Sequence, residues 1–155
     1  MPYEIDQSGK IENTSKNTII CLSNGKTITL LLKAKDKRKL QEIFRRNGQN
    51  RNYVLFSFSA VISLILKDFR NHELVTIDRE YFGKEAIIKE IISEMIKTNK
   101  IKPEIVFDLV GKDSNSHKFA YKVATNQVKP TIVVRSEEVL REIKKTEVGK
   151  RLKNA

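Results

Sequence analysis

The pattern of hydrophobic and polar residues predicts a strand-rich first part of the chain and a second part in which strands and helices alternate. Runs rich in β-branched residues between turn formers predict strands, and apolar residues repeated every three or four positions predict helices. We expect strands at 3–5, 18–22, 27–34, 74–77, 104–110 and 131–134. We expect helices after Asp36 and at 53–69, 84–97, 114–125 and 136–145.

Two junctions in this pattern carry specific local signals. Asn24-Gly25 lies between two β-branched runs and predicts a two-residue hairpin loop of type I′, in which both central residues have positive φ. Asp36 precedes a helical repeat and is expected to cap it. Residues 53–69 are apolar nearly all round and lack Gly and Pro, which favours a buried helix over a strand.

The order of elements predicts an α/β fold with a mixed sheet. The first three strands form an antiparallel meander, and the later strands join it in parallel through right-handed crossovers. A length of 155 residues favours one domain, which we assign to residues 1–155 with a basic C-terminal tail from about 146. Cys21 is the only cysteine, which excludes an internal disulfide and a multi-thiolate zinc site.

The charge of the chain favours a polyanionic partner. The chain contains thirty Lys and Arg residues and nineteen Asp and Glu residues, which gives a formal net charge of +11. Such a charge attracts nucleic acid, DNA or RNA, although a general adaptation for solubility is the alternative. Basic residues cluster at 26–51 and 141–153. The candidate phosphate contacts are Arg45, Arg46 and Arg51, together with Lys112 and Lys118.

Nothing in the sequence predicts a membrane partner. The N-terminus lacks the charged and apolar regions of a signal peptide. The longest apolar stretch, residues 54–66, contains three serines and is too short to span a bilayer. We therefore expect a cytoplasmic protein.

Carboxylates lie where the predicted strands end. Asp6 closes the first strand, Asp78 follows Leu-Val-Thr-Ile, and Asp113 follows the strand at 104–110, with Asp108 as the alternative third acid. Ligands gather beyond the carboxyl ends of parallel strands, and converging carboxylates suit Mg²⁺ or Mn²⁺. The simpler explanations are turns at Asp6 and Asp78 and a helix cap at Asp113.

This order of elements, with acids at these places, resembles the ribonuclease H-like superfamily of nucleases, resolvases and transposases. Asp6-Gln7-Ser8-Gly9 is also similar to the Asp-Glu-Ser-Gly opening of a family of uncharacterised proteins assigned to that superfamily. The resemblance implies a nuclease that hydrolyses phosphodiester bonds with divalent metal. It also implies that Asp6, Asp78 and Asp113 are the catalytic residues.

Two departures leave a second interpretation open. Gln7 replaces the acid of that opening, and only Glu42 corresponds to the glutamate of the superfamily's first helix. The alternative is therefore a non-catalytic nucleic-acid-binding module with a degenerate site, and a small-ligand or protein-interaction domain is a third. The sequence contains no P-loop, serine-hydrolase elbow or His-Glu-x-x-His motif.

Some further side chains are candidates for contacts with the substrate. His117 could orient a phosphate or a water, or could be an ordinary surface histidine. Four aromatic residues could stack on bases, with burial in the hydrophobic core as the alternative: Tyr53, Phe56, Phe82 and Tyr121.

Overall fold

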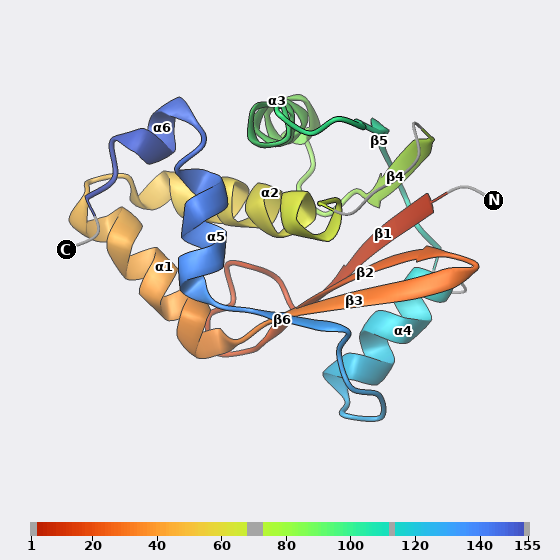
Figure 1. Ribbon diagram of the computed structural model, residues 1–155. Helices are drawn as coiled ribbons and strands as arrows, with labels where there is room; N and C mark the ends of the chain where they lie inside the picture. Colours follow the sequence, from red (N-terminus) through yellow and green to blue (C-terminus); the bar gives the residue numbers. More distant parts are fainter. Residues whose placement is uncertain (1–2, 68–72, 112–113, 154–155) are drawn as a thin grey trace.

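A six-stranded mixed sheet forms the centre of the computed structural model, which describes residues 3–67, 73–111 and 114–153. The strands are β1 (Tyr3–Ser8), β2 (Thr18–Asn24), β3 (Lys26–Leu32), β4 (Leu74–Asp78), β5 (Glu104–Asp108) and β6 (Ile132–Val134). Their spatial order is β5-β4-β1-β2-β3-β6 (Figure 1). The β1-β2 and β2-β3 pairs are antiparallel, and the β1-β4, β4-β5 and β3-β6 pairs are parallel. The predicted α/β class with a mixed sheet is confirmed.

Helices cover the two faces of the sheet unequally (Figure 1). The helices of the larger layer are α1 (Ala34–Arg46), α2 (Tyr53–Ile65), α3 (Glu85–Met95) and α5 (Ser136–Ile143). Helix α4 (Asn115–Ala124) lies alone on the opposite face, where it contacts β1, β2 and β3. A 3-10 turn at Asn50–Asn52 and the short helix α6 (Glu147–Lys150) complete the elements. No helix in the described ranges is long and apolar enough to cross a membrane.

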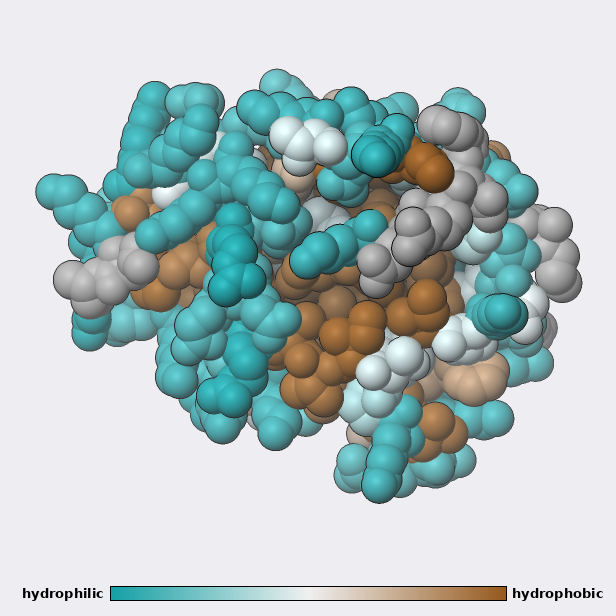
Figure 2. All heavy atoms as spheres, in the orientation of Figure 1, coloured by the Kyte–Doolittle hydropathy of each residue, from teal (hydrophilic) through white to brown (hydrophobic). Residues whose placement is uncertain are grey.

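The main core fills the space between the sheet and the larger helix layer. Helix α2 is apolar all round because it packs against α3, α5 and the sheet at once. Figure 2 shows hydrophobic residues gathered between this layer and the sheet, with hydrophilic residues over α1, α5 and α6. A smaller core on the other face joins Ile19 and Cys21 to Ala120 and Val123 of α4. Burial raises the pKa of the Cys21 thiol to about 12, so this cysteine is an unreactive core residue.

The hairpin between β2 and β3 is confirmed, but its turn is tighter than the sequence predicts. Asn24 pairs with Lys26, so Gly25 alone connects the strands. Gly25 has φ of 70°, whereas Asn24 keeps a negative φ, and the type I′ prediction is wrong. The two strands pair up to Asn24 and Lys26, so only Gly25 needs the left-handed backbone conformation. Glycine adopts that conformation readily because it has no Cβ atom.

Two sequence assignments near the ends of α1 and α5 also change. Helix α1 begins at Ala34, and the buried Asp36 carboxylate accepts the Ser136 N–H at 3.0 Å, so Asp36 joins α1 to α5 instead of capping its own helix. Of the segment assigned as a basic C-terminal tail, residues 147–153 are described, and they contact the rest of the domain. Thr146 caps α6 by accepting the Gly149 N–H at 3.0 Å, and Leu152 is buried in the main core, which holds the segment to the domain.

Candidate metal centre

Three predicted acids occupy one row across adjacent parallel strands. Ile5 pairs with Ile77 and Asp78 pairs with Asp108, so the register brings Asp6, Asp78 and Asp108 level with one another. Side chains alternate between the faces of a sheet, and Asp6 lies on the α4 face because it stands opposite Cys21 of the smaller core. Two of the acids predicted from the sequence, Asp6 and Asp78, therefore meet at one edge of the sheet. Asp6 itself lies inside β1, which continues to Ser8, and does not close the strand.

Asp6 and Asp78 form a cluster with a third acid, Glu80, that the sequence interpretation missed. One carboxylate oxygen from each of the three lies within 4.8 Å of the other two, and the group could hold a metal ion. Asp6 is only 3% exposed, and the other two are half-buried. The signal for Glu80 was the Asp-x-Glu spacing, since residues two apart project to the same side of an extended chain. We name Asp6, Asp78 and Glu80 the acidic cluster.

Fixed donors hold the acidic cluster in place. The Gln7 N–H donates to Asp6 Oδ1 at 2.8 Å, and the Val110 N–H donates to Asp78 Oδ1 at 2.7 Å. His117 Nδ1 lies 2.7 Å from Asp6 Oδ2. Ser114 accepts the His117 N–H at 3.1 Å as the cap of α4, so the first turn of that helix positions the imidazole. His117 is thus a positioning residue for Asp6.

Burial and mutual repulsion disfavour the negative charges of the acidic cluster, and a bound cation would offset both effects. Burial raises the pKa of Asp6, and the nearby Asp78 carboxylate acts in the same direction, against the lowering effect of the hydrogen bonds from Gln7 and His117. Burial, followed by the hydrogen bond and charge of Asp78, raises the pKa of Glu80 to about 7. Near neutral pH, Glu80 thus retains its proton in a large fraction of the molecules. A divalent cation could supply the charge that this proton now supplies.

The remaining predicted ligands lie outside the acidic cluster. Asp108 is exposed, and its Oδ1 accepts the N–H of the adjacent Leu109 at 2.8 Å. It occupies the same row as Asp78 but is not one of the three grouped acids. Asp113 and Lys112 lie outside the described residues. Lys118 is exposed on α4 directly after His117.

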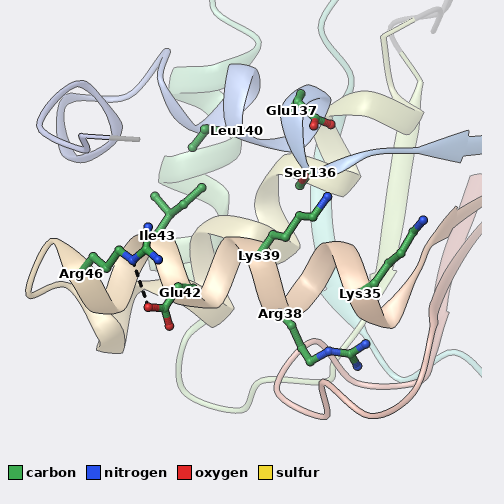
Figure 3. A pocket seen from close by; sticks show the side chains of 9 residues that line it. All are labelled: Lys35, Arg38, Lys39, Glu42, Ile43, Arg46, Ser136, Glu137 and Leu140. Atoms are coloured by element: carbon green, nitrogen blue, oxygen red, sulfur yellow. Dashed lines mark hydrogen bonds and ion pairs between the residues drawn. The ribbon is translucent and has the colours of Figure 1, made fainter. Parts of the chain in front are cut away.

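The predicted arginine contacts are not beside the acids. Helix α1 follows β3 and leads away from the sheet (Figure 1), so its last turn, which carries Arg45 and Arg46, lies away from β1 and β4. Both pair with Glu42 on the same helix, and Figure 3 shows the Arg46–Glu42 pair. Arg51 is exposed in the following 3-10 turn. These arginines can contact a polyanion only away from the acidic cluster.

A basic groove of about 610 Å³ separates α1 from α5. In Figure 3, Lys39 points from α1 toward the start of α5, while Arg38 points away from it. The floor of the groove includes Ile43 and Leu140. Because the groove belongs to the larger helix layer and the acidic cluster faces α4, the two are separate features.

Comparison with known proteins assigns no family: no protein-family model, curated protein or solved structure matches the chain. The functional interpretation therefore rests on the geometry and charge of this chain's own residues.

Proposed function

We propose that this chain binds nucleic acid and hydrolyses its phosphodiester bonds with Mg²⁺ or Mn²⁺, on a ribonuclease H-like fold. The observation that carries the proposal is the meeting of Asp6, Asp78 and Glu80 at the carboxyl ends of two parallel strands. The sheet supports it, because an antiparallel meander joined through β1 to parallel β4 and β5 is the arrangement that the resemblance implies.

The donor set of the acidic cluster fits a hard divalent cation. Three carboxylates offer only oxygen ligands, and oxygen ligands are the kind that Mg²⁺ and Mn²⁺ prefer. Asp6, Asp78 and Glu80 would hold the metal. In such sites the bound metal activates a water and stabilises the leaving oxygen of a phosphodiester.

The chain's own part in the reaction is to fix the carboxylates that would hold the metal. The Gln7 and Val110 N–H groups and the His117 ring hold Asp6 and Asp78 in position. In hydrolysis, the oxygen of water bonds to phosphorus, the bond from phosphorus to a sugar oxygen breaks, and that oxygen takes a proton.

The contacts of Gln7 favour an active site over a degenerate one. Gln7 Nε2 donates to the Tyr81 hydroxyl at 3.4 Å, and the Tyr81 ring packs against Phe58 of α2. Its side chain therefore lies on the face opposite the acidic cluster. The presence of Gln7, where the family that the sequence resembles has an acid, therefore removes no carboxylate from the acidic cluster. Glu80 supplies a third carboxylate to that cluster.

Exposed cations lie along the edge of the sheet that carries the acidic cluster, and among them Lys10 is close enough to Glu80 to act on its pKa. They lie in the β1-β2 loop, at the start of α1, on α4 and before α5. These residues are Lys10, Lys16, Lys33, Lys35, Lys118 and Arg135. Phosphates flanking a scissile bond at the cluster would be within reach of this rim, which we name the basic rim.

Nucleic-acid binding is expected to weaken steeply and linearly in a plot of log affinity against log salt. For single-stranded nucleic acid, each contact between a cation and a phosphate contributes about −0.7 to the slope of log affinity against log salt. Replacing Lys10, Lys16 and Lys33 together by glutamine should therefore reduce the slope by about 2. The measurement is fluorescence anisotropy with labelled single-stranded and duplex DNA and RNA, between about 50 and 200 mM salt.

The matched control for this experiment removes the same charge from the other edge. Lys97, Lys100 and Lys102 are exposed between α3 and β5, at the amino ends of the strands. Their triple replacement by glutamine should leave most of the affinity and slope unchanged. Wild-type protein that binds no nucleic acid at the lowest salt, or equal losses in the two triple variants, would contradict the proposal.

A further inference from the structure

A second groove, of about 550 Å³, lies between β1, the β1-β2 loop and α4. Ser8 lines it from β1, two residues after Asp6 and therefore on the same face of the strand. Tyr121 lines it from α4, four residues after His117 and therefore on the same side of the helix. The groove is thus bounded by the two elements that meet at the Asp6–His117 contact. We name it the α4 groove.

Tyr121 offers an open aromatic surface in the α4 groove. Its side chain is 59% exposed. Tyr53 and Phe56, which the sequence also left as candidates for stacking, are core residues. Phe82 is exposed but lines a different pocket, beside α3 and β5. Of these four aromatic residues, only Tyr121 combines exposure with a place in the groove.

The opposite wall of the α4 groove is a loop that the fold holds firmly. The buried Lys37 ammonium donates to the carbonyls of Lys10 and Asn13, at 3.0 and 2.6 Å, and to the Thr18 hydroxyl at 3.0 Å. The Ala34 N–H donates to Asn17 Oδ1 at 2.9 Å. These bonds fix the loop from within, so binding against it incurs little ordering cost.

Lys16 adds a cation to this wall. It is exposed, lines the α4 groove, and pairs with no carboxylate among the described residues. A ligand that fits the groove thus meets an aromatic face on one side and a free ammonium on the other. A nucleotide offers both complements, a flat base and a charged phosphate.

We propose that the α4 groove binds an unpaired nucleotide adjacent to the scissile phosphate, with its base on Tyr121 and a phosphate on Lys16. This inference rests on the proposed function and narrows its substrate to nucleic acid that is single-stranded at this point. Bases inside a duplex are stacked on both faces, whereas an unpaired base is free to stack on an aromatic side chain. Stacking of this kind tolerates any base.

The test compares base-containing and base-free strands without metal. The probes are a labelled oligothymidylate and an abasic oligomer of equal length, measured by anisotropy in EDTA. Wild type should bind the oligothymidylate about tenfold more tightly, the effect of one stacked base. Tyr121→Ala should lose that preference, and Tyr121→Phe should keep it. Ile87→Ala, which trims an exposed apolar residue of α3, is the control and should behave as wild type.

The outcomes separate this inference from the proposed function. A wild type that binds both probes equally, or a Tyr121→Ala variant that retains the preference, overturns the nucleotide groove while nucleic-acid binding stands. A wild type that binds neither probe overturns the groove, and one that also binds no duplex DNA or RNA overturns the proposed function as well. Melting temperatures of the variants in EDTA establish that each is folded.

Discussion

Replacing Asp78 by asparagine is expected to abolish Mn²⁺-dependent cleavage of nucleic acid while the fold stays intact. The amide oxygen can still accept the Val110 N–H, which is 2.7 Å from Asp78 Oδ1. The amide cannot supply the negative charge that holds a divalent cation. We expect a loss of at least about a hundredfold, comparable to removing one electrostatic group from a reaction centre. The measurement is the initial cleavage rate with Mn²⁺ on single-stranded and duplex substrates.

The control for this prediction is Glu104→Gln. Glu104 is an exposed acid at the first position of β5, at the opposite end of the same strands. Its replacement changes the net charge equally and should leave the cleavage rate close to that of wild type. Cleavage by Asp78→Asn at the wild-type rate, or an equal loss in Glu104→Gln, would refute a catalytic role for the acidic cluster.

In EDTA, the protein should become less stable as the pH rises from about 5 to 8. The pKa of Glu80 is about 7 in the folded chain, against an ordinary value of 4.5. Between these values the folded chain keeps a proton that the unfolded chain has lost, so the free energy of unfolding falls as the pH rises. The raised pKa of Asp6 acts in the same direction. Burial lowers the pKa of Lys37 to about 8, so this group acts in the opposite direction, and its effect begins only near the upper end of this pH range.

Glu80→Gln is the variant that isolates this effect. It should flatten the pH dependence and raise the melting temperature at pH 8 by a few degrees, since about 1 kcal/mol corresponds to about 2–4 °C in a chain of this size. Melting curves by circular dichroism at pH 5, 6, 7 and 8 make the comparison, with Glu104→Gln as the control. A wild type whose melting temperature rises between pH 5 and 7 would show that Glu80 does not hold its proton.

Patterning predicted most of the architecture because each element carries its own signal. The meander, the buried helix α2 and the strand that ends at Asp78 are all readable from local periodicity. The meeting of Asp6 and Asp78 followed from one topological rule, that parallel strands end at one edge. The ends of the strands were harder to predict. The sequence pattern ends the first strand before Asp6, whereas pairing with β2 extends β1 to Ser8.

Contacts between residues distant in sequence could not be predicted in this way. His117 lies 111 positions from Asp6, and Asp36 lies 100 positions from Ser136, so no local pattern links either pair. Glu80 was missed for another reason. It follows a strand in a stretch that looks like a turn. The Asp-x-Glu spacing places Glu80 on the same side as Asp78, but the position of β4 beside β1 is needed to show that this side faces Asp6.

The most direct test of the account is a titration of Mn²⁺ into the protein at pH 8, followed by calorimetry or by the magnetic resonance signal of the free ion. Wild type and Glu104→Gln should bind Mn²⁺ alike, and Asp6→Asn and Glu80→Gln should bind it far more weakly. Wild-type affinity should fall at pH 6, because Mn²⁺ must then displace the proton of Glu80. Mn²⁺ that fails to bind wild type, or that binds all four proteins equally, would contradict the claim that Asp6, Asp78 and Glu80 form a metal centre.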